Sequence, residues 1–250
     1  MGKRAFYTIA DKQNLKYADM MANSLKKFHP NDEVILFDEE QVKATGDPHF
    51  YYRATPALAK TLFSQGFDMI CKLDADQVIT GNLDHIWEGD FDVAVVNNSN
   101  PRENKVSPVN VWDIHPFAYV NCGFVVMKNT PFVKHWFDLC YSDHFQTYQF
   151  REQDLLNIMV FYMNDKLGGP YKVKFLDNSS KWHGLISKQY APMTKLVDGK
   201  IILPKNDEWP QDEDKQIVAY HWAGGNSPDK MKYNLIFPKE VAKFIDGLVK

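Results

Sequence analysis

The stretch "MICKLDADQVITGNLDHIW" (residues 69–87) decides how the chain is organised. An apolar run at 68–73 has the length and composition of a buried β-strand, and it ends abruptly in Asp74, Ala75 and Asp76. In an extended segment residues i and i+2 face the same way, so we expect Asp74 and Asp76 to point together from the carboxyl end of the strand. Ligands of open α/β sheets bind at that end. Two carboxylates on one side repel each other unless a cation or protons relieve them.

The paired carboxylates favour a site for a hard divalent cation. Mg²⁺ or Mn²⁺ takes oxygen ligands and fills its remaining positions with water or substrate phosphates. An Asp-x-Asp pair also occurs by chance in solvated turns, and from the pair alone that alternative stays open. An EF-hand calcium loop is excluded, because its fifth and sixth positions require Asp or Asn and then Gly, whereas this chain has Val78 and Ile79.

The segments around this stretch predict an α/β domain. A strand at 5–10, a helix at 17–28 and a strand at 33–38 form a βαβ unit, and Thr-Pro opens a further helix at 55–67. We expect further strands at 91–97, 119–129 (broken by Asn-Cys-Gly), 171–177, 200–204 and 216–225. Further helices are expected at 132–141, 152–164 and 239–249. The simplest architecture is a single Rossmann-like domain over 1–250, with helices flanking a mixed central sheet.

Composition excludes several classes of protein. A net charge of −3 gives no reason to expect nucleic acid as a partner. Cys71, Cys122 and Cys140 are odd in number and widely spaced, which favours reduced thiols over a disulfide framework or a zinc site. No uncharged apolar run approaches the length of a membrane span, and the opening residues lack a signal-peptide core, so we expect a cytoplasmic protein.

Missing motifs narrow the function further. The chain has no GxGxxG after its first strand, no GxxxxGK[ST], no GxSxG and no HExxH. A sugar nucleotidyltransferase needs a glycine-rich loop after the first strand, and "TIADKQNL" contains no glycine, which argues against that alternative. The long segment 98–116, rich in Asn, Pro and Ser, is expected to be a loop of the kind that often covers an active site.

Four segments, in order, carry a resemblance to a known family. They are "CKLDADQVITGNLDHIW", "YVNCGFVVMKN", "REQDLLN" and "HWAGG". Together they resemble GT-A-fold glycosyltransferases, and glycosyltransferase family 8 in particular, from about residue 5 to about residue 230. Three positions depart from the family pattern: Cys122 replaces the usual Ser, Glu152 replaces the first Asp of Asp-Gln-Asp, and Ser227 stands where the family carries a Lys that contacts the diphosphate.

The resemblance implies a GT-A fold, with a nucleotide-binding part at about 1–97 and an acceptor and catalytic part at about 98–250. It implies metal-dependent, retaining transfer of a sugar from a nucleotide-sugar donor, a UDP-sugar, to a glycan, lipid-linked or protein acceptor that the sequence does not identify. Asp74, Asp76 and His221 would bind Mn²⁺ or Mg²⁺, which stabilises the departing diphosphate as a Lewis acid.

The resemblance also assigns residues to the donor. Glu152, Gln153 and Asp154 would lie across the transferred sugar, with Gln153 as an electrostatic partner in a front-side reaction; Asp154 could equally be a helix cap. Residues implied to bind the donor are Tyr7, Thr8, Ala10, Asp11, Arg53, Lys60, Asp74, Ala75, Asn121, Gly123, Gly224, Gly225 and Lys230. A catalytically silent module that binds a nucleotide-sugar or a sugar remains the principal alternative.

Overall fold

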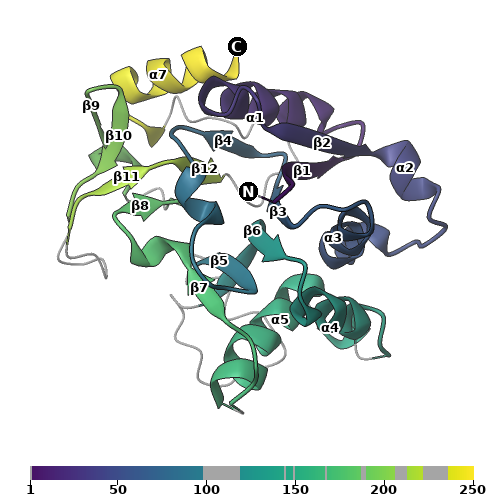
Figure 1. The fold of residues 1–250 in the computed structure, drawn as a ribbon. Coiled ribbons are helices and arrows are strands. Elements are labelled where there is room, and N and C mark those ends of the chain that lie inside the picture. The colour runs from purple at the N-terminus through teal and green to yellow at the C-terminus, as the bar shows by residue number, and fades with distance from the viewer. Residues whose placement is uncertain are drawn as a thin grey trace.

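A six-stranded mixed sheet lies at the centre of the computed structural model, which describes residues 2–97, 119–143, 145–148, 150–166, 168–186, 190–205, 213–221 and 236–250. The strand order is β2-β1-β3-β6-β5-β7 (Figure 1), and β6 runs antiparallel to both β3 and β5, whereas the other pairs are parallel. The strands are β1 (Arg4–Ala10), β2 (Glu33–Asp38), β3 (Met69–Leu73), β5 (Val93–Asn97), β6 (Val120–Lys128) and β7 (Val173–Phe175). The expected mixed α/β architecture is therefore confirmed.

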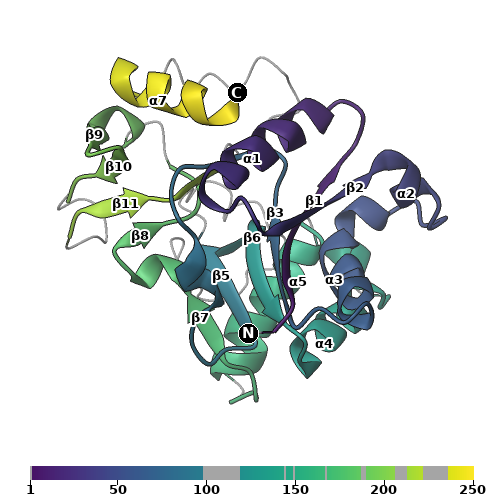
Figure 2. The same ribbon diagram turned by 45° about the horizontal axis from the view of Figure 1, so that its top comes forward.

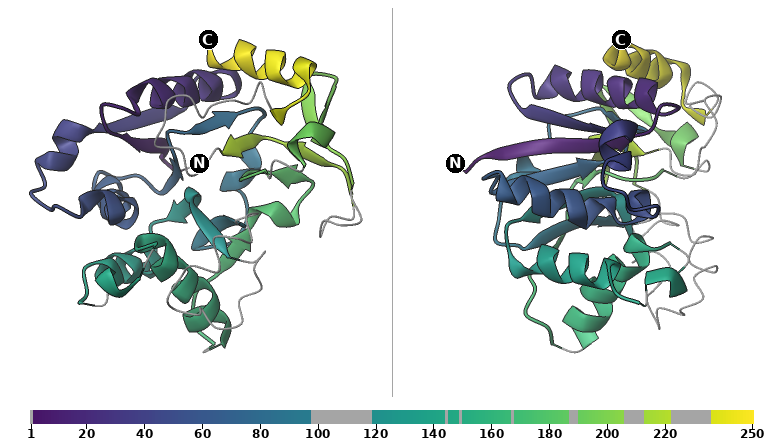
Figure 3. Two further views of the ribbon diagram at one scale, coloured as in Figure 1. Left: turned by 180° about the vertical axis from the view of Figure 1, so that it is seen from behind. Right: turned by 90° about the vertical axis from the view of Figure 1, so that its right-hand side faces the viewer.

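Helices cover both faces of this sheet. On one face lie α3 (Ala54–Ser64), α4 (Pro131–Cys140) and α5 (Glu152–Asn157), and their apolar side chains share a core with Ala5, Tyr7 and Val125 of the sheet. On the other face lies α1 (Leu15–Phe28), which packs beside α7 (Lys239–Val249). Figures 2 and 3 show α1 and α7 side by side, on the opposite side of the sheet from α3, α4 and α5. A short helix, α2 (Glu39–Lys43), follows β2.

Local sequence explains where these helices begin and end. In α1 the buried positions recur at helical spacing, with Tyr17, Met21 and Leu25 on one side. The end of α3 is a Schellman motif: Gly66 adopts a φ of +87°, and the amides of Gly66 and Phe67 donate to the carbonyls of Phe63 (3.1 Å) and Leu62 (3.4 Å). Gly66 therefore ends the helix as the sequence indicates.

Two smaller sheets complete the structure. One has the order β8-β11-β10-β9, from β8 (Lys181–Trp182), β9 (Lys195–Val197), β10 (Lys200–Leu203) and β11 (Lys215–Ile217). The other pairs β4 (Gln77–Ile79) antiparallel with β12 (Ala219–His221). Because β4 begins directly after the turn that holds Asp74 and Asp76, the β4–β12 pair brings a distant part of the chain to that turn.

Three expected elements differ from the structure. Strand β6 is not broken at Asn-Cys-Gly; instead its register with β5 shifts, so that Val95 pairs with Val125 and Val96 with Asn121. The helix expected at 152–164 is α-helical only to Asn157 and continues as π-helical turns, Ile158–Lys166. The described part of the strand expected at 216–225 is two strands in two sheets, β11 and β12. The loop expected at 98–116 lies outside the described residues.

Candidate active site

Asp74, Asp76 and His221 form a compact cluster at the edge of the central sheet. The Nε2 atom of His221 lies 3.1 Å from Oδ1 of Asp76 and 3.4 Å from Oδ2 of Asp74, and one ligand atom from each residue lies within 4.8 Å of the others. The two aspartates are in a turn rather than an extended segment, yet they point together as expected. His221 reaches them because it lies opposite Gln77 in the β4–β12 pair.

Opposite charges hold this cluster together. Burial lowers the pKa of His221, but Asp76 and Asp74 outweigh burial and raise that pKa above its ordinary value. Burial raises the pKa of Asp76, but the neighbouring His221 outweighs it and lowers the pKa. Two carboxylates and one imidazole are a donor set suited to Mn²⁺ or Mg²⁺. Among the described residues, the buried Nδ1 atom of His221 has no hydrogen-bond partner.

Gly123 gives His221 the space it occupies. A Cβ atom at Gly123 would lie 2.3 Å from Cε1 and 2.6 Å from Nδ1 of His221. The backbone of the same glycine is tied down on both sides: its amide donates to Oδ1 of Asn121 (2.6 Å), and its carbonyl accepts from the amide of Asp74 (2.8 Å) and from Nε2 of Gln77 (2.8 Å). The Asn-Cys-Gly segment therefore supports the aspartate turn and the histidine together.

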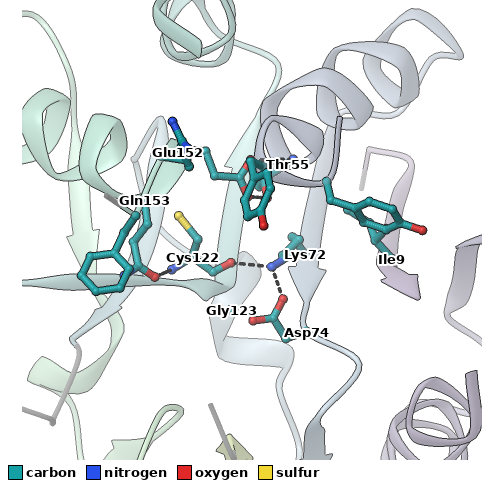
Figure 4. Close-up of a pocket in the computed structure, with 12 residues that line it drawn as sticks. Ile9, Thr55, Lys72, Asp74, Cys122, Gly123, Glu152 and Gln153 are labelled. Carbon is teal, nitrogen blue, oxygen red and sulfur yellow. Dashed lines mark hydrogen bonds and ion pairs between the residues drawn. The ribbon is translucent and has the colours of Figure 1, made fainter. Parts of the chain in front are cut away.

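A pocket of about 340 Å³ opens beside the cluster and shares Asp74 with it. Its lining comes from β1, β3, β6 and the starts of α3 and α5 (Figure 4). The lining residues are Ile9, Tyr51, Tyr52, Thr55, Lys72, Asp74, Cys122, Gly123, Phe150, Arg151, Glu152 and Gln153. Four of them, Asp74, Gly123, Glu152 and Gln153, are residues that the sequence assigned to the site.

The three residues that open α5, Glu152, Gln153 and Asp154, have two different roles. Glu152 and Gln153 line the pocket. Both carboxylate oxygens of Glu152 accept hydrogen bonds from Thr55, one from its amide (3.0 Å) and one from its hydroxyl (2.7 Å). Asp154, the third residue of α5, is fully buried and does not line the pocket; it accepts from the hydroxyl of Tyr119 (2.6 Å) and from the amide of Phe150 (2.9 Å), just before the N-cap residue Arg151.

The amide of Gln153 is also held in place. Its Oε1 atom accepts from the backbone amide of Cys122 (3.0 Å), and its Nε2 atom lies 3.4 Å from the hydroxyl of Tyr119. Figure 4 shows Gln153 and Glu152 along one wall of the pocket and Asp74 across from them. The arrangement offers polar groups on two sides of a space large enough for a sugar ring.

The first strand supplies mainly buried groups. Tyr7 is buried and its hydroxyl donates to the carbonyl of Thr55 (2.9 Å), whereas Thr8 and Ala10 face the opposite side of the sheet. Asp11 follows β1 at the same edge as Asp74 and accepts from the amide and side chain of Asn14 (2.9 and 2.8 Å). Of this strand, the residue that lines the pocket is Ile9.

Two predicted cations lie elsewhere. Arg53 pairs with Asp47 (3.3 Å) and stacks over Tyr141 and Phe145, and Lys60 lies over the ring of Phe137 (4.2 Å). Neither lines the pocket, because each packs its long side chain on aromatic rings instead.

The other donor residues expected from the sequence are placed as follows. Ala75 packs against Ala10, and Asn121 bonds Gly123 next to the cluster. Gly224, Gly225 and Lys230 lie outside the described residues.

Lys72 is one of the pocket residues that the sequence did not assign to the site, and it is buried. Only 5% of its surface is exposed, and its ammonium donates to Oδ1 of Asp74 and to the carbonyl of Cys122 (2.9 Å). Burial lowers the pKa of Lys72, but the charges of Asp74 and Glu152 outweigh it and raise that pKa. A signal was available, since a lysine within the apolar strand "MICKL" rarely lies buried without a partner.

The arrangement of strands and helices is that of the GT-A-fold glycosyltransferases, which confirms the expected fold. Over 98% of this chain and 96% of the other, the structure is similar to that of the galactosyltransferase LgtC in complex with donor and acceptor sugar analogues, with a TM-score of 0.57 and 14% identity. It is also similar to a glycosyltransferase involved in glycosylation of the major capsid of PBCV-1, over 92% of this chain and 99% of the other, with a TM-score of 0.57 and 10% identity.

A sequence relative agrees with this fold. The chain is 25% identical over 174 residues to the lipopolysaccharide 1,2-glucosyltransferase of Escherichia coli. The match covers 64% of this chain and half of that protein. No protein-family model matches the sequence. Within the described residues, none of the helices combines the length and apolar character needed to cross a bilayer.

Proposed function

We propose that this protein is a metal-dependent, retaining glycosyltransferase that uses a nucleotide-sugar donor, a UDP-sugar. The observation that carries the proposal is the Asp74, Asp76 and His221 cluster, because it shares Asp74 with a pocket whose far wall holds Glu152 and Gln153. The fold and the named relatives, all of them glycosyltransferases, support it. A binding module without catalysis remains the rival, because the same groups could bind a donor without cleaving it.

The cluster would hold Mn²⁺ or Mg²⁺ through Asp74, Asp76 and His221. The ion would supply Lewis-acid stabilisation of the negative charge on the departing nucleoside diphosphate. Other groups of the chain hold these ligands in place. The absence of a side chain at Gly123 leaves room for His221 beside the aspartates. The Asp74 amide and the Gln77 side chain both donate to the Gly123 carbonyl, which fixes the turn. The nucleotide would lie along the edge where β1 and β3 end, near Asp11.

The hydrogen bonds around the sugar pocket favour a front-side reaction. Both oxygens of Glu152 are engaged by Thr55, and Oε1 of Gln153 is engaged by the amide of Cys122. An amide is in any case a poor nucleophile. The departing diphosphate oxygen would therefore take the proton from the acceptor hydroxyl, while Gln153 stabilises positive charge on the anomeric carbon. Because the diphosphate leaves from the same face of the sugar that the acceptor hydroxyl attacks, this route retains the configuration of the anomeric carbon.

The acceptor class is proposed only coarsely. LgtC binds an acceptor sugar analogue, and the Escherichia coli relative is a lipopolysaccharide glucosyltransferase. Two exposed aromatic residues at the pocket, Tyr51 and Tyr52, offer ring faces on which a sugar can stack. We therefore favour a glycan acceptor, free or lipid-linked, over a protein.

Donor hydrolysis tests the proposal. The protein is incubated with UDP- and GDP-sugars in the presence of Mn²⁺ or EDTA, and the released nucleoside diphosphate is measured. We expect release from one donor, dependent on Mn²⁺ and lost in Asp76→Asn. The matched control is Asp138→Asn, an exposed aspartate on α4 outside the pocket, which should behave like the unaltered protein.

A nucleotide-binding assay distinguishes a silent binding module from a protein that does not use nucleotide-sugars at all. Metal-dependent binding of a nucleotide-sugar with no release, even with added glycan acceptors, would favour the silent binding module. Neither release nor metal-dependent nucleotide binding would refute the proposal, and Asp74 and Asp76 would then be a turn paired with a histidine.

A further inference from the structure

Lys72 presents an ammonium group to the floor of the pocket. It lies on β3, between β1 and β6, and its side chain rises from the middle of the sheet toward the space between Asp74 and Glu152 (Figure 4). A charge in the interior of a sheet is costly unless it is paired and hydrogen-bonded. This cost makes the position unusual for a residue with only a packing role.

The hydrogen bonds of Lys72 leave one donor to account for. An ammonium carries three N–H donors. Among the described residues, the carboxylate of Asp74 and the carbonyl of Cys122 take two of them. Because Lys72 lines the pocket, the third N–H is available to a bound molecule. The two existing bonds also fix where that N–H points.

The surrounding charge indicates what kind of molecule this is. Asp74 and Glu152 both face Lys72, so two carboxylates accompany one cation. Because the cation at Asp74 and Asp76 would hold the diphosphate, the group that meets Lys72 on the Glu152 side of the pocket would be the transferred sugar, whose hydroxyl can accept from the ammonium and donate to a carboxylate. Arg151, the other cationic side chain at the pocket, is half-buried and donates to the carbonyl of Gln146 (3.1 Å). Lys72 is therefore the fixed donor at the floor.

We propose that Lys72 positions the transferred sugar by donating a hydrogen bond to one of its hydroxyl groups, and that it thereby determines which hexose the enzyme accepts. This inference rests on the proposed function. Because Asp74 and Cys122 clamp the ammonium, it cannot follow a hydroxyl that moves between axial and equatorial positions. A site built to hydrogen-bond one hydroxyl discriminates strongly against a sugar that lacks it there.

Binding measurements with three probes test this role. UDP, UDP-glucose and UDP-galactose are titrated calorimetrically in the presence of Mn²⁺; the two sugars differ in the orientation of one hydroxyl. Lys72→Met removes the charge and the donors and keeps the chain length. Lys134→Met is the matched control, because Lys134 is exposed on α4, pairs with Asp138 and lies outside this pocket. Lys72→Arg keeps a cation beside Asp74 and serves if Lys72→Met does not fold.

For Lys72→Met we expect UDP affinity to remain within about twofold, whereas the affinity for the preferred UDP-hexose falls about 10- to 100-fold and the preference between epimers shrinks in step. Lys72→Arg should keep the affinity for UDP and change the ratio between the epimers. Lys134→Met should change none of these values.

Two results would overturn the role of Lys72. One is an equal loss of affinity for UDP and for both UDP-hexoses, since Lys72 would then act only through Asp74. The other is an unchanged epimer ratio in a folded Lys72 variant. Failure of the unaltered protein to bind any of the three probes is a different outcome: it refutes the proposed function, and this inference with it.

Discussion

Gly123→Ala is the most informative single change, because it adds one methyl group where His221 needs space. The new Cβ would lie 2.3 Å from Cε1 of His221 and 2.6 Å from Oδ1 of Asn121. Carbon atoms in contact lie about 3.5–4.0 Å apart, so the imidazole must move by roughly 1 Å. Since His221 is buried, it can move only by displacing its neighbours or by leaving the aspartates.

Gly123→Ala should weaken metal binding and lower the stability of the fold. Ligand distances in metal sites are fixed to within about 0.2 Å, so a displacement of roughly 1 Å removes His221 as an effective ligand. We expect Mn²⁺ affinity to fall at least 10- to 100-fold, the cost of disturbing a ligand's support. Overpacking should lower the free energy of unfolding by about 1–3 kcal/mol, or roughly 2–12 °C in melting temperature for a chain of this size.

Calorimetric titration of Mn²⁺ and thermal melts with and without EDTA measure the two effects. Gly247→Ala is the matched control: apart from the backbone of α7 itself, no atom of the described residues lies within 4 Å of a Cβ at that position, and alanine favours a helix. It should leave Mn²⁺ affinity unchanged and the melting temperature equal or higher. Unchanged Mn²⁺ affinity in Gly123→Ala, whatever its stability, would refute the argument that Gly123 shapes the cation site.

Three further predictions concern stability. Mn²⁺ at 100 times its dissociation constant should raise the free energy of unfolding by about 2.7 kcal/mol, seen as a higher melting temperature that Asp76→Asn abolishes. Glu152→Ala leaves the buried amide and hydroxyl of Thr55 without their acceptor, and urea unfolding should show a loss of about 2–4 kcal/mol, larger than that of Thr55→Val. Burial and the neighbouring His183 lower the pKa of His85 to about 3. The unfolded chain, in which this pKa is about 6.5, takes up a proton that the native state does not, so stability is lost as the pH falls below about 6.5. Relative to His85→Gln, which does not titrate, the unaltered protein should lose about 1 kcal/mol more between pH 7.5 and pH 5, after a discount for the exposed part of the ring.

Most of the fold could be predicted from short-range patterns. The strand at 33–38 and the helix at 239–249 have the limits that their period-2 and 3.6-residue signals predict, whereas the strand expected at 68–73 begins at 69 and the helix expected at 17–28 begins at 15. A further signal was overlooked: Asp38 and Gln41 form a capping box that begins α2, and Asp-Glu-Glu-Gln spells it in the sequence. The π-helical turns after Asn157 could not be predicted, because their apolar residues show no helical face.

The site was only partly predictable, because its geometry depends on pairings between distant segments. Asp74 and Asp76 were recognisable from the strand that precedes them. The meeting of Asp76 with His221, 145 residues away, depends on the β4–β12 pair, which the sequence did not indicate. Arg53 and Lys60 were expected near the donor, but neither lines the pocket, because nearby aromatic rings engage both side chains.

The register shift in β6 explains how so many polar groups converge on one site. Between Val125 and Asn121 the strand loses its pairing with β5, which frees the backbone of Cys122 and Gly123 from the regular ladder. These freed atoms bind the groups that line the pocket: the Cys122 carbonyl accepts from Lys72, and the Cys122 amide donates to Gln153.

The Gly123 carbonyl extends this convergence to the cation site. It accepts from the amide of Asp74 and the side chain of Gln77, while the absence of a side chain at Gly123 admits His221. An unshifted β6 would pair the backbone of Cys122 with β5 and take away one of the two acceptors of the buried Lys72, at a cost of about 1–3 kcal/mol. The irregular Asn-Cys-Gly segment is therefore a requirement of the site, and substitutions that restore a regular strand there should harm metal binding and donor binding together.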